Sequence, residues 1–574
     1  MTLQRKFMQK LTKIIRKHKV ILAIIVLASV LRFFQISMVP PSLNWDEISH
    51  GYNAYSILKT GKDEWGNFLP IIFRAYGDYK LPVYIYLTVV SEFFLGLNAL
   101  SVRLVSILAG IGTVVLSYFL AKEFFRDKVT PLLAALLVAV SPWTFFLSRG
   151  AFEANLALFF IVAGIYCFYK GLKKTIYYLP SAIFLGLSVW TYNSARVFTP
   201  LILVSLAVIY WKELKLGFKK HRKNLGLAIV LLTIFLAPMF AQLAQSTGQA
   251  RYSKVTVLDE GAIAEINESR RLSGLNPTLN RLVNNKATYL GNAFVANWLS
   301  HYSPEFLFFE GGSHFQFSTP GFGLIYLVNF PFLFWGIALC FKKRDKVSGL
   351  LLAWLVLGPV ASSFTREAPH VLRAITILPV LMFLTALGLK DIWSRASKKK
   401  VALGALLAFT YFVLLTLSVV SYFKNYFTLY PSEYSWSWQY GHREVAEFIE
   451  ENYEKYDKIV MTKKYGEPHE FMLFYLKWEP SEYQKDENLN RFYQTGWYWV
   501  DSFDKFFFIN DWQVVEEGSG NFEFNQESGE VVSCSPGEFS CLLVTSPGNV
   551  PEGWELIQMV NFLDNETAFE LYEN

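Results

Sequence analysis

The sequence predicts a polytopic α-helical membrane protein that ends in a small α/β domain. Three observations predict this fold class. Hydrophobic residues make up 53% of the 574 residues and charged residues only 18%, and the mean hydropathy is +0.27. Apolar runs recur through residues 1–422. Residues 423–574 carry 10 Lys and Arg against 28 Asp and Glu, whereas the rest of the chain carries 44 against 19. This composition excludes a disordered chain, a coiled coil and an ordinary soluble enzyme.

The apolar runs predict about eleven membrane spans, since a spanning helix needs about 20 mostly apolar residues. Several of the runs are shorter than this, which tilted helices or wider boundaries would accommodate. The predicted spans are residues 20–39, 101–121, 130–147, 154–169, 178–191, 197–211, 225–243, 322–341, 347–364, 371–389 and 401–422.

The basic loops between these spans predict their orientation. They all lie on one side if every segment spans, and an excess of Lys and Arg marks the cytoplasmic side. The N-terminus is therefore expected in the cytoplasm and the C-terminal domain outside the plasma membrane. A nucleic-acid partner is not indicated, because the positive charges alternate with apolar runs. The basic segments are residues 1–19, 122–128, 170–174, 212–223, 342–346 and 390–400.

Three stretches leave alternatives open. If residues 83–100 spanned the membrane, the next basic loop would turn outward, so we interpret them as an interfacial or re-entrant helix containing Glu92. Residues 178–211 could form one helix, but a break at Thr191–Arg196 keeps both basic flanks on one side. Residues 1–39 have the charge order of a signal peptide, yet no small-residue cleavage site follows, which favours a retained anchor.

The predicted domains are a transmembrane domain at residues 1–422, with external loops 40–100 and 244–321, and an extracytoplasmic α/β domain at residues 423–574.

An oxidising exterior makes a disulfide between Cys534 and Cys541 plausible. No Cys or His group has the spacing of a zinc site. No cofactor is predicted, although an acidic site could still recruit a divalent metal. In the tail, strands are expected at residues 458–462, 506–509 and 542–545, and helices at 441–453 and 468–478.

Acids and cations gather at the predicted external ends of the spans and are scarce near their middles. This distribution indicates a site at the outer membrane surface for an anionic, lipid-attached ligand, and not a transport path at the membrane midplane. Asp46 and Glu47 follow the first span. Asp46 could simply cap a helix. A carboxylate beside the membrane could also act as a base.

The cations near this surface allow similar alternatives. Lys80 could reach a lipid head group or neutralise a bound phosphate. Arg373 lies in an apolar run, where a charge is usually functional, although an ion pair with Glu367 or Glu153 would be a structural explanation. The loop at residues 301–326 could cover a pocket, while its histidines could equally be ordinary surface residues. Further polar candidates are Tyr52, Asp78, Arg149, Tyr192, Arg196, His301, His314 and His370.

In their order and spacing these segments resemble GT-C superfamily glycosyltransferases of the dolichyl-phosphate-mannose–protein mannosyltransferase type, a group that includes bacterial aminoarabinose transferases. The resemblance covers most of residues 20–455. Its strongest parts are the acidic pair with Tyr52 and the run that begins at Lys80, where Leu81 replaces the first Pro of the usual Lys-Pro-Pro-Leu-Tyr-Tyr-like pattern. Residues 149–155, 186–200 and 369–379 also look like family segments.

The resemblance implies a GT-C fold and an enzyme that transfers a sugar from a polyprenyl-phosphate donor on the outer face of the membrane, without an obligatory metal. The acceptor could be a protein, lipid or glycan, and the tail lacks the family's large β-trefoil insertion. Two alternatives are a transporter or flippase, and a ligase for lipid-linked glycans. The resemblance implies catalytic roles for Asp46, which would act as the base, and for Glu47. It implies phosphate binding by Lys80, Arg149, Arg196 and Arg373. The residues implied in substrate binding are Tyr52, Asp78, Glu153, Tyr192, His301, His314 and His370.

Overall fold

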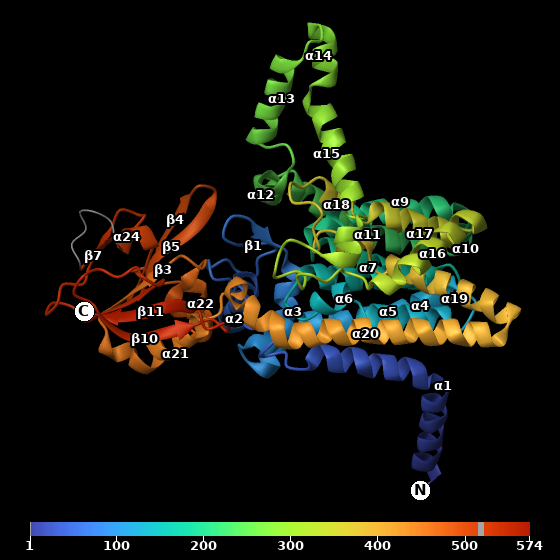
Figure 1. The fold of residues 1–574 in the computed structure, drawn as a ribbon, viewed down its shortest axis with the longest axis horizontal. Coiled ribbons are helices and arrows are strands. Elements are labelled where there is room, and N and C mark those ends of the chain that lie inside the picture. Colours follow the sequence, from blue (N-terminus) through green and yellow to red (C-terminus); the bar gives the residue numbers. More distant parts are fainter. Residues whose placement is uncertain (1, 515–521) are drawn as a thin grey trace. The chain divides into compact units, whose positions relative to one another are not determined.

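The computed structural model describes residues 2–514 and 522–574. The chain forms two compact units, whose elements are labelled in Figure 1. Unit 1 contains Met1–Phe34 and Ser106–Phe423. Unit 2 contains Gln35–Val105 and Lys424–Asn574, so its two segments are far apart in the sequence.

Unit 1 is almost entirely helical. Among the described residues, six helices are long and apolar enough to cross a membrane, or seven if the bent pair α9 and α10 is one span. The predicted number of eleven stays a prediction. Outside residues 244–321, the α-helices of unit 1 are α1 (Thr2–Phe33), α5 (Thr130–Val140), α6 (Pro142–Phe146), α7 (Glu153–Gly171), α8 (Tyr178–Val189), α9 (Asn193–Ile209), α10 (Trp211–Lys220), α11 (Arg222–Leu243), α16 (Phe330–Lys343), α17 (Lys346–Leu357), α18 (Val360–Ser363) and α19 (Val380–Lys399). Two further helices, α4 (Ala99–Phe124) and α20 (Val401–Glu433), belong to both units.

Glycines allow two of these helices to pack closely. A Cβ atom at Gly336 of α16 would lie 1.9 Å from the carbonyl oxygen of Leu384 in α19. Similarly, a Cβ at Gly388 of α19 would lie 2.0 Å from the carbonyl oxygen of Phe332 in α16. Small residues of this kind are typical of contacts between membrane helices.

Prolines correct two of the predicted spans. Residues 371–379 were predicted to be helical, but they form turns and a short 3-10 helix, and α19 begins only after Pro379. The span predicted at residues 130–147 is interrupted at Ser141, which is extended because Pro142 follows it. The break predicted within residues 178–211 is present, because α8 ends at Val189 and α9 begins at Asn193.

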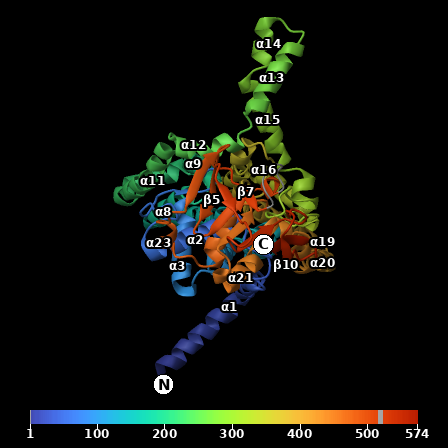
Figure 2. The ribbon, with the colours of Figure 1, turned by 90° about the vertical axis from the view of Figure 1, so that its left-hand side faces the viewer.

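Residues 244–321, predicted as an external loop, contain four α-helices and a short π-helix at Glu305–Phe309. α13 (Glu260–Leu272) and α15 (Lys286–Ser300) lie side by side and project from unit 1, with α14 (Pro277–Val283) at the tip (Figures 1 and 2). Capping explains where they begin, since the side chains that precede them accept hydrogen bonds from first-turn amides. The fourth helix is α12 (Ser246–Val255).

A seven-stranded sheet forms the centre of unit 2, with strand order β10-β11-β9-β3-β6-β5-β4. β3 pairs in parallel with β6 and β9, and its KIVMT sequence is almost wholly buried, as expected for a central strand. The strands are β3 (Lys458–Thr462), β4 (Asn490–Gln494), β5 (Trp497–Phe503), β6 (Phe506–Ile509), β9 (Cys541–Thr545), β10 (Glu555–Asn561) and β11 (Thr567–Glu573), and the helices of this segment include α21 (His442–Asn452), α22 (Pro468–Tyr475), α23 (Pro480–Tyr483) and α24 (Asp511–Val514).

A separate hairpin of β7 (Glu523–Asn525) and β8 (Val531–Ser533) packs beside the sheet. Cys534 follows β8 and forms a disulfide with Cys541, the first residue of β9. Both cysteines are buried in the apolar core that includes Val460. The disulfide therefore links the hairpin directly to the central sheet.

The first segment of unit 2 contains α2 (Trp45–Thr60), β1 (Phe73–Arg74), β2 (Tyr79–Lys80) and α3 (Pro82–Leu95). α3 corresponds to the predicted interfacial helix. α2 packs against α22 at Gly51, where a Cβ atom would lie 2.5 Å from Cε2 of Phe474 and 2.8 Å from Cγ2 of Val102. The absence of a side chain at this position permits the close packing of the two helices.

Candidate functional site

The helix cap at the start of α2 is Asn44, not Asp46. The side chain of Asn44 accepts a hydrogen bond from the amide of Glu47 at 3.0 Å, and the Glu47 carboxylate accepts one from the amide of Asn44 at 3.2 Å. This reciprocal pair is a capping box. Asp46 is consequently not needed as the cap, and its carboxylate can take part in other interactions.

Asp46 pairs with Lys80. Nζ of Lys80 lies 2.5 Å from Oδ1 of Asp46. The Asp46 side chain is 50% exposed, whereas that of Lys80 is only 9% exposed. Lys80 ends β2, which pairs with β1 in an antiparallel hairpin, and Pro82 then begins α3. The structure therefore presents an accessible carboxylate beside a largely buried ammonium group.

Glu47 lies in different surroundings from its neighbour. It is 1% exposed and forms two hydrogen bonds with Arg103, from Nε to Oε1 at 2.9 Å and from Nη2 to Oε2 at 3.0 Å. Arg103 also donates to the carbonyl oxygens of Ile36, Pro40 and Ser42. Glu47 thus anchors the chain that leads into α2, and this geometry favours a structural role over the predicted catalytic one.

Three buried acids form a second cluster in unit 2. Burial raises the pKa of Glu64 to about 7, although Arg491 opposes this shift. Burial raises the pKa of Glu467 to about 8, against the hydrogen bond from Trp497. The pKa of Glu470 is raised well above its usual range by burial and then by the charge of Glu64. Crowding these carboxyl groups in a buried environment favours their protonated forms.

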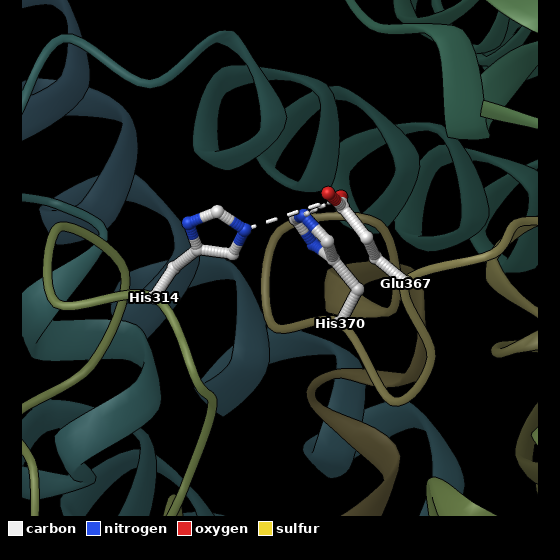
Figure 3. Close-up of side chains that lie close together, drawn as sticks. All are labelled: His314, Glu367 and His370. Carbon is white, nitrogen blue, oxygen red and sulfur yellow. Dashed lines mark ion pairs between the residues drawn. The ribbon is translucent and has the colours of Figure 1, made fainter. Parts of the chain in front are cut away.

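Two loops of unit 1 bring His314, Glu367 and His370 together. Figure 3 shows both imidazole rings beside the carboxylate of Glu367. Nε2 of His314 and Nε2 of His370 each lie 3.9 Å from Oε2 of Glu367. Arg373 donates to the same oxygen at 2.8 Å and to Oγ1 of Thr365 at 3.0 Å. Arg373 therefore forms an ion pair with Glu367. Such a pair was the structural explanation that the sequence allowed for a charge in this apolar run.

His301 is a buried structural histidine next to this cluster. Its Nδ1 lies 2.6 Å from the carbonyl oxygen of Asn297, and its Nε2 lies 2.8 Å from Oγ of Ser362. Burial lowers its pKa to about 4, although the hydrogen bond to Asn297 opposes the shift. A neutral ring that donates from Nδ1 and accepts at Nε2 satisfies both contacts.

The remaining predicted phosphate ligands lie in the helical part of unit 1. Nη1 of Arg149 donates to the carbonyl oxygens of Leu31 and Arg32 at 2.8 and 3.0 Å, so this buried arginine holds the end of α1. Nε of Arg196 donates to the carbonyl oxygen of Val189 at 3.2 Å. Within the described part of the chain, the buried Nη2 of Arg196 has no hydrogen-bond partner.

The other predicted substrate-binding residues divide between the two units. Tyr52 is fully buried in unit 2 and donates to the carbonyl oxygen of Trp478 at 3.2 Å. Asp78 lies in the turn between β1 and β2 and is partly exposed. In unit 1, Glu153 is the first residue of α7 and Tyr192 precedes α9.

Arg32, Arg103 and the buried acids of the tail were not among the residues predicted from the sequence. Arg32 and Arg103 carried a usable signal, because a charge inside an apolar run is costly and usually has a specific role. Arg32 is fully buried and donates to the carbonyl oxygen of Ala139 at 3.1 Å. Glu467 and Glu470 carried a weaker signal, because both precede the apolar run at residues 471–476 and do not lie inside it.

Comparison with known proteins finds a sequence similarity in the first part of the chain. Residues 22–249 match the sequence model of a family described as dolichyl-phosphate-mannose-protein mannosyltransferase. The predicted resemblance is confirmed. A Bacillus subtilis (strain 168) protein named "Putative mannosyltransferase YycA" is 24% identical over 194 residues. This match covers 33% of the present chain and only 28% of that relative.

The fold matches that of ArnT from Cupriavidus metallidurans. The ArnT structure bound to undecaprenyl phosphate aligns with a TM-score of 0.52 at 11% identity, covering 97% of this chain and 98% of ArnT. The apo form of ArnT gives a TM-score of 0.52 at 12% identity, covering 96% and 97% of the two chains. The chain thus shares the fold of ArnT, and six or seven of its described helices are long and apolar enough to cross a membrane.

Proposed function

We propose that this protein is a membrane glycosyltransferase that moves a sugar from a polyprenyl-phosphate donor to an acceptor, with Asp46 as the general base. The observation that carries the proposal is the half-exposed Asp46 carboxylate beside Lys80. Both residues lie within the stretch that matches the mannosyltransferase family. The GT-C fold supports the same reaction class.

In the proposed reaction, Asp46 takes the proton of an acceptor hydroxyl as the hydroxyl oxygen attacks the anomeric carbon of the sugar. The bond between that carbon and the phosphate oxygen breaks, and its electron pair leaves with the polyprenyl phosphate. Attack opposite the leaving group inverts the anomeric configuration. The ammonium of Lys80 stabilises the negative charge that develops on the departing phosphate, an electrostatic contribution typical of such sites.

The proposal includes the predicted orientation. Residues 1–422 form the catalytic membrane domain, and residues 423–574 form an extracytoplasmic domain. The donor sugar is carried on a polyprenyl phosphate in the bilayer, and the acceptor is a protein, lipid or glycan that meets it on the outer face. Phosphate-binding roles for Arg149, Arg196 and Arg373 remain predictions, as does the reaction without a metal.

The test uses the purified full-length protein and a panel of polyprenyl-phosphate sugars, with mass spectrometry to detect released or transferred sugar. We expect Asp46→Asn to lower turnover by about 10² to 10⁴-fold, the usual contribution of a general base. Donor binding should persist, because the substituted amide keeps the shape of the carboxylate. Full turnover in Asp46→Asn would remove the catalytic assignment.

A matched control is Glu552→Gln, which neutralises an exposed acid elsewhere in unit 2. We expect this variant to transfer sugar at the wild-type rate. If the wild-type protein moves the donor across a vesicle membrane without breaking the sugar–phosphate bond, the protein is a transporter and the transferase proposal fails.

A further inference from the structure

We propose that His314, Glu367 and His370 form a binding site for one zinc ion. The three candidate ligand atoms all lie within 4.8 Å of one another. They come from two loops of unit 1, one before α16 and the other between α18 and α19. The sequence did not indicate this site. Glu367 and His370 are three residues apart, but His314 is far from them in the chain, so the short spacings of a zinc motif are absent.

The observed distances are close to those of a tetrahedral site. Zinc–ligand bonds of about 2.0–2.1 Å place neighbouring ligand atoms about 3.4 Å apart. Each histidine Nε2 is 3.9 Å from the Glu367 oxygen, so each has to approach by about half an ångström. His314 and Glu367 can make this adjustment because their side chains are 49% and 57% exposed.

The burial of the ligands also suits a metal site. The His370 side chain is only 6% exposed, so it is the buried ligand of the cluster. The other two ligands are exposed, so the ion can reach the site from solvent. Phe317 lies against both rings, with centroid separations of 5.0 Å from His314 and 5.4 Å from His370. This contact limits the orientations that the rings can adopt.

The donor atoms favour zinc over the common oxygen-binding cations. Two imidazole nitrogens and one carboxylate oxygen are a recurrent zinc ligand set, and three protein ligands leave a fourth position open. Magnesium and calcium prefer sites made only of oxygen ligands. The chemistry of the cluster therefore points to zinc, or to cobalt(II) used as its spectroscopic substitute.

Arg373 and Thr365 supply the surrounding contacts that orient the carboxylate. Nη2 of Arg373 donates to Oε2 of Glu367 at 2.8 Å, and Nη1 donates to Oγ1 of Thr365 at 3.0 Å. A carboxylate oxygen has more than one lone pair, so Glu367 can accept from Arg373 and still bind a metal. Such outer contacts commonly fix metal ligands in place.

One contact has to change when the ion binds. The backbone amide of Arg373 donates to Nδ1 of His370 at 3.3 Å, which requires Nδ1 without a proton. Zinc bound at Nε2 of a neutral imidazole leaves the proton on Nδ1. The ring therefore has to rotate slightly away from this long hydrogen bond. The bound ion would then cross-link the two loops.

The test measures metal binding by the full-length protein in detergent, after chelator treatment and buffer exchange. We expect one zinc ion per chain by elemental analysis and visible absorption bands on titration with cobalt(II). His314→Gln and Glu367→Gln should each weaken zinc binding by more than about a hundredfold, since even outer-contact changes cost 10- to 100-fold. Zinc should raise the thermal midpoint of the wild type but not that of either variant.

His221→Gln serves as the control because His221 is also exposed in unit 1 but lies outside the cluster. We expect it to keep the wild-type stoichiometry and affinity. The inference is overturned if the wild-type protein retains no zinc at micromolar concentrations, or if His314→Gln binds zinc as tightly as the wild type. His314 is exposed, so a folded variant can be obtained and the result does not depend on a damaged core.

Discussion

At the scale of single residues, Asp46 and Glu47 show how one helix start can separate two acids. Both carboxylates belong to the first turn of α2. The carboxylate of Glu47 turns back into the capping box and towards Arg103, whereas that of Asp46 is half-exposed beside Lys80. Because the two side chains have different partners, their substitution should affect different properties of the protein.

We expect Glu47→Ala to lower stability by about 3–5 kcal/mol, because it leaves the Arg103 guanidinium buried without its counter-charge. Both side chains of the pair are only 1% exposed. The thermal midpoint of the purified protein measures this loss, with Glu552→Gln as the control for removing a negative charge. A Glu47→Ala protein as stable as the wild type would contradict the structural role of this ion pair.

The sequence predicted an acid beside the membrane at Asp46, because its position directly after an apolar run can be read locally. It did not predict that Asn44 would cap α2, although the Asn-x-x-Glu spacing contained this information. The grouping of His314 with Glu367 and His370 could not be predicted, since it depends on how two loops fold towards each other. Local patterns predict caps, but contacts between distant loops require the tertiary structure.

At the scale of elements, α22 and the residue before it place two acidic side chains in buried positions. Glu470 lies in α22 and Glu467 immediately precedes it, and each is at most 2% exposed. The pKa of Glu467 is raised to about 8, first by burial. Folding therefore favours the neutral carboxyl group, and this contribution to stability is present in full at acidic pH.

We expect the stability of unit 2 to fall as the pH rises from about 4.5 through about 8. Because the folded-state pKa of Glu467 is above the ordinary value of 4.5, the unfolded chain loses the proton first. At about 1.36 kcal/mol per pKa unit, the loss from this residue is at most about 5 kcal/mol. Thermal midpoints at pH 5.5 and 8.5 measure the effect.

Glu467→Gln should reduce this difference between the two midpoints, since the amide stays neutral and can still accept the hydrogen bond from Trp497. Glu530→Gln provides a comparison at an exposed acid of the same unit. An unchanged pH dependence in Glu467→Gln would show that this carboxyl group is not the one that titrates.

The link between β8 and β9 gives a second prediction at this scale. Cys534 and Cys541 are seven residues apart, and closing so short a loop stabilises by about 2.5 kcal/mol in the chain-entropy account. A reductant should lower the thermal midpoint of the wild type to that of the double variant Cys534→Ser/Cys541→Ser. The double variant should not respond to the reductant, and a wild type that is equally insensitive would contradict the prediction.

At the scale of the whole molecule, hydropathy predicted the helical membrane part, and alternating or continuous apolar runs predicted three strands of the tail. The predicted strand at residues 458–462 coincides with β3. The helices within residues 244–321 were not predicted, because this stretch was assigned only as an external loop between two spans. The grouping of Gln35–Val105 with Lys424–Asn574 could not be predicted either, since it depends on contacts between segments far apart in the chain.

The predicted membrane orientation is tested at the same scale. A reporter enzyme that is active only outside the cytoplasm should be active when fused after Asn574. A truncated fusion after Lys400, in a predicted cytoplasmic loop, should be inactive. The physical reason is that basic loops remain on the cytoplasmic side during insertion. Activity of the second fusion but not of the first would reverse the orientation.

The close packing at Gly51 has a consequence for how mutations of this protein are interpreted. Any side chain at this position would meet Phe474 and Val102 and push the helix that carries Asp46 out of place. A mutational survey would therefore score this glycine as essential although it carries no reactive group. Natural variation at position 51 should accordingly be tolerated only where position 474 or 102 shrinks in compensation.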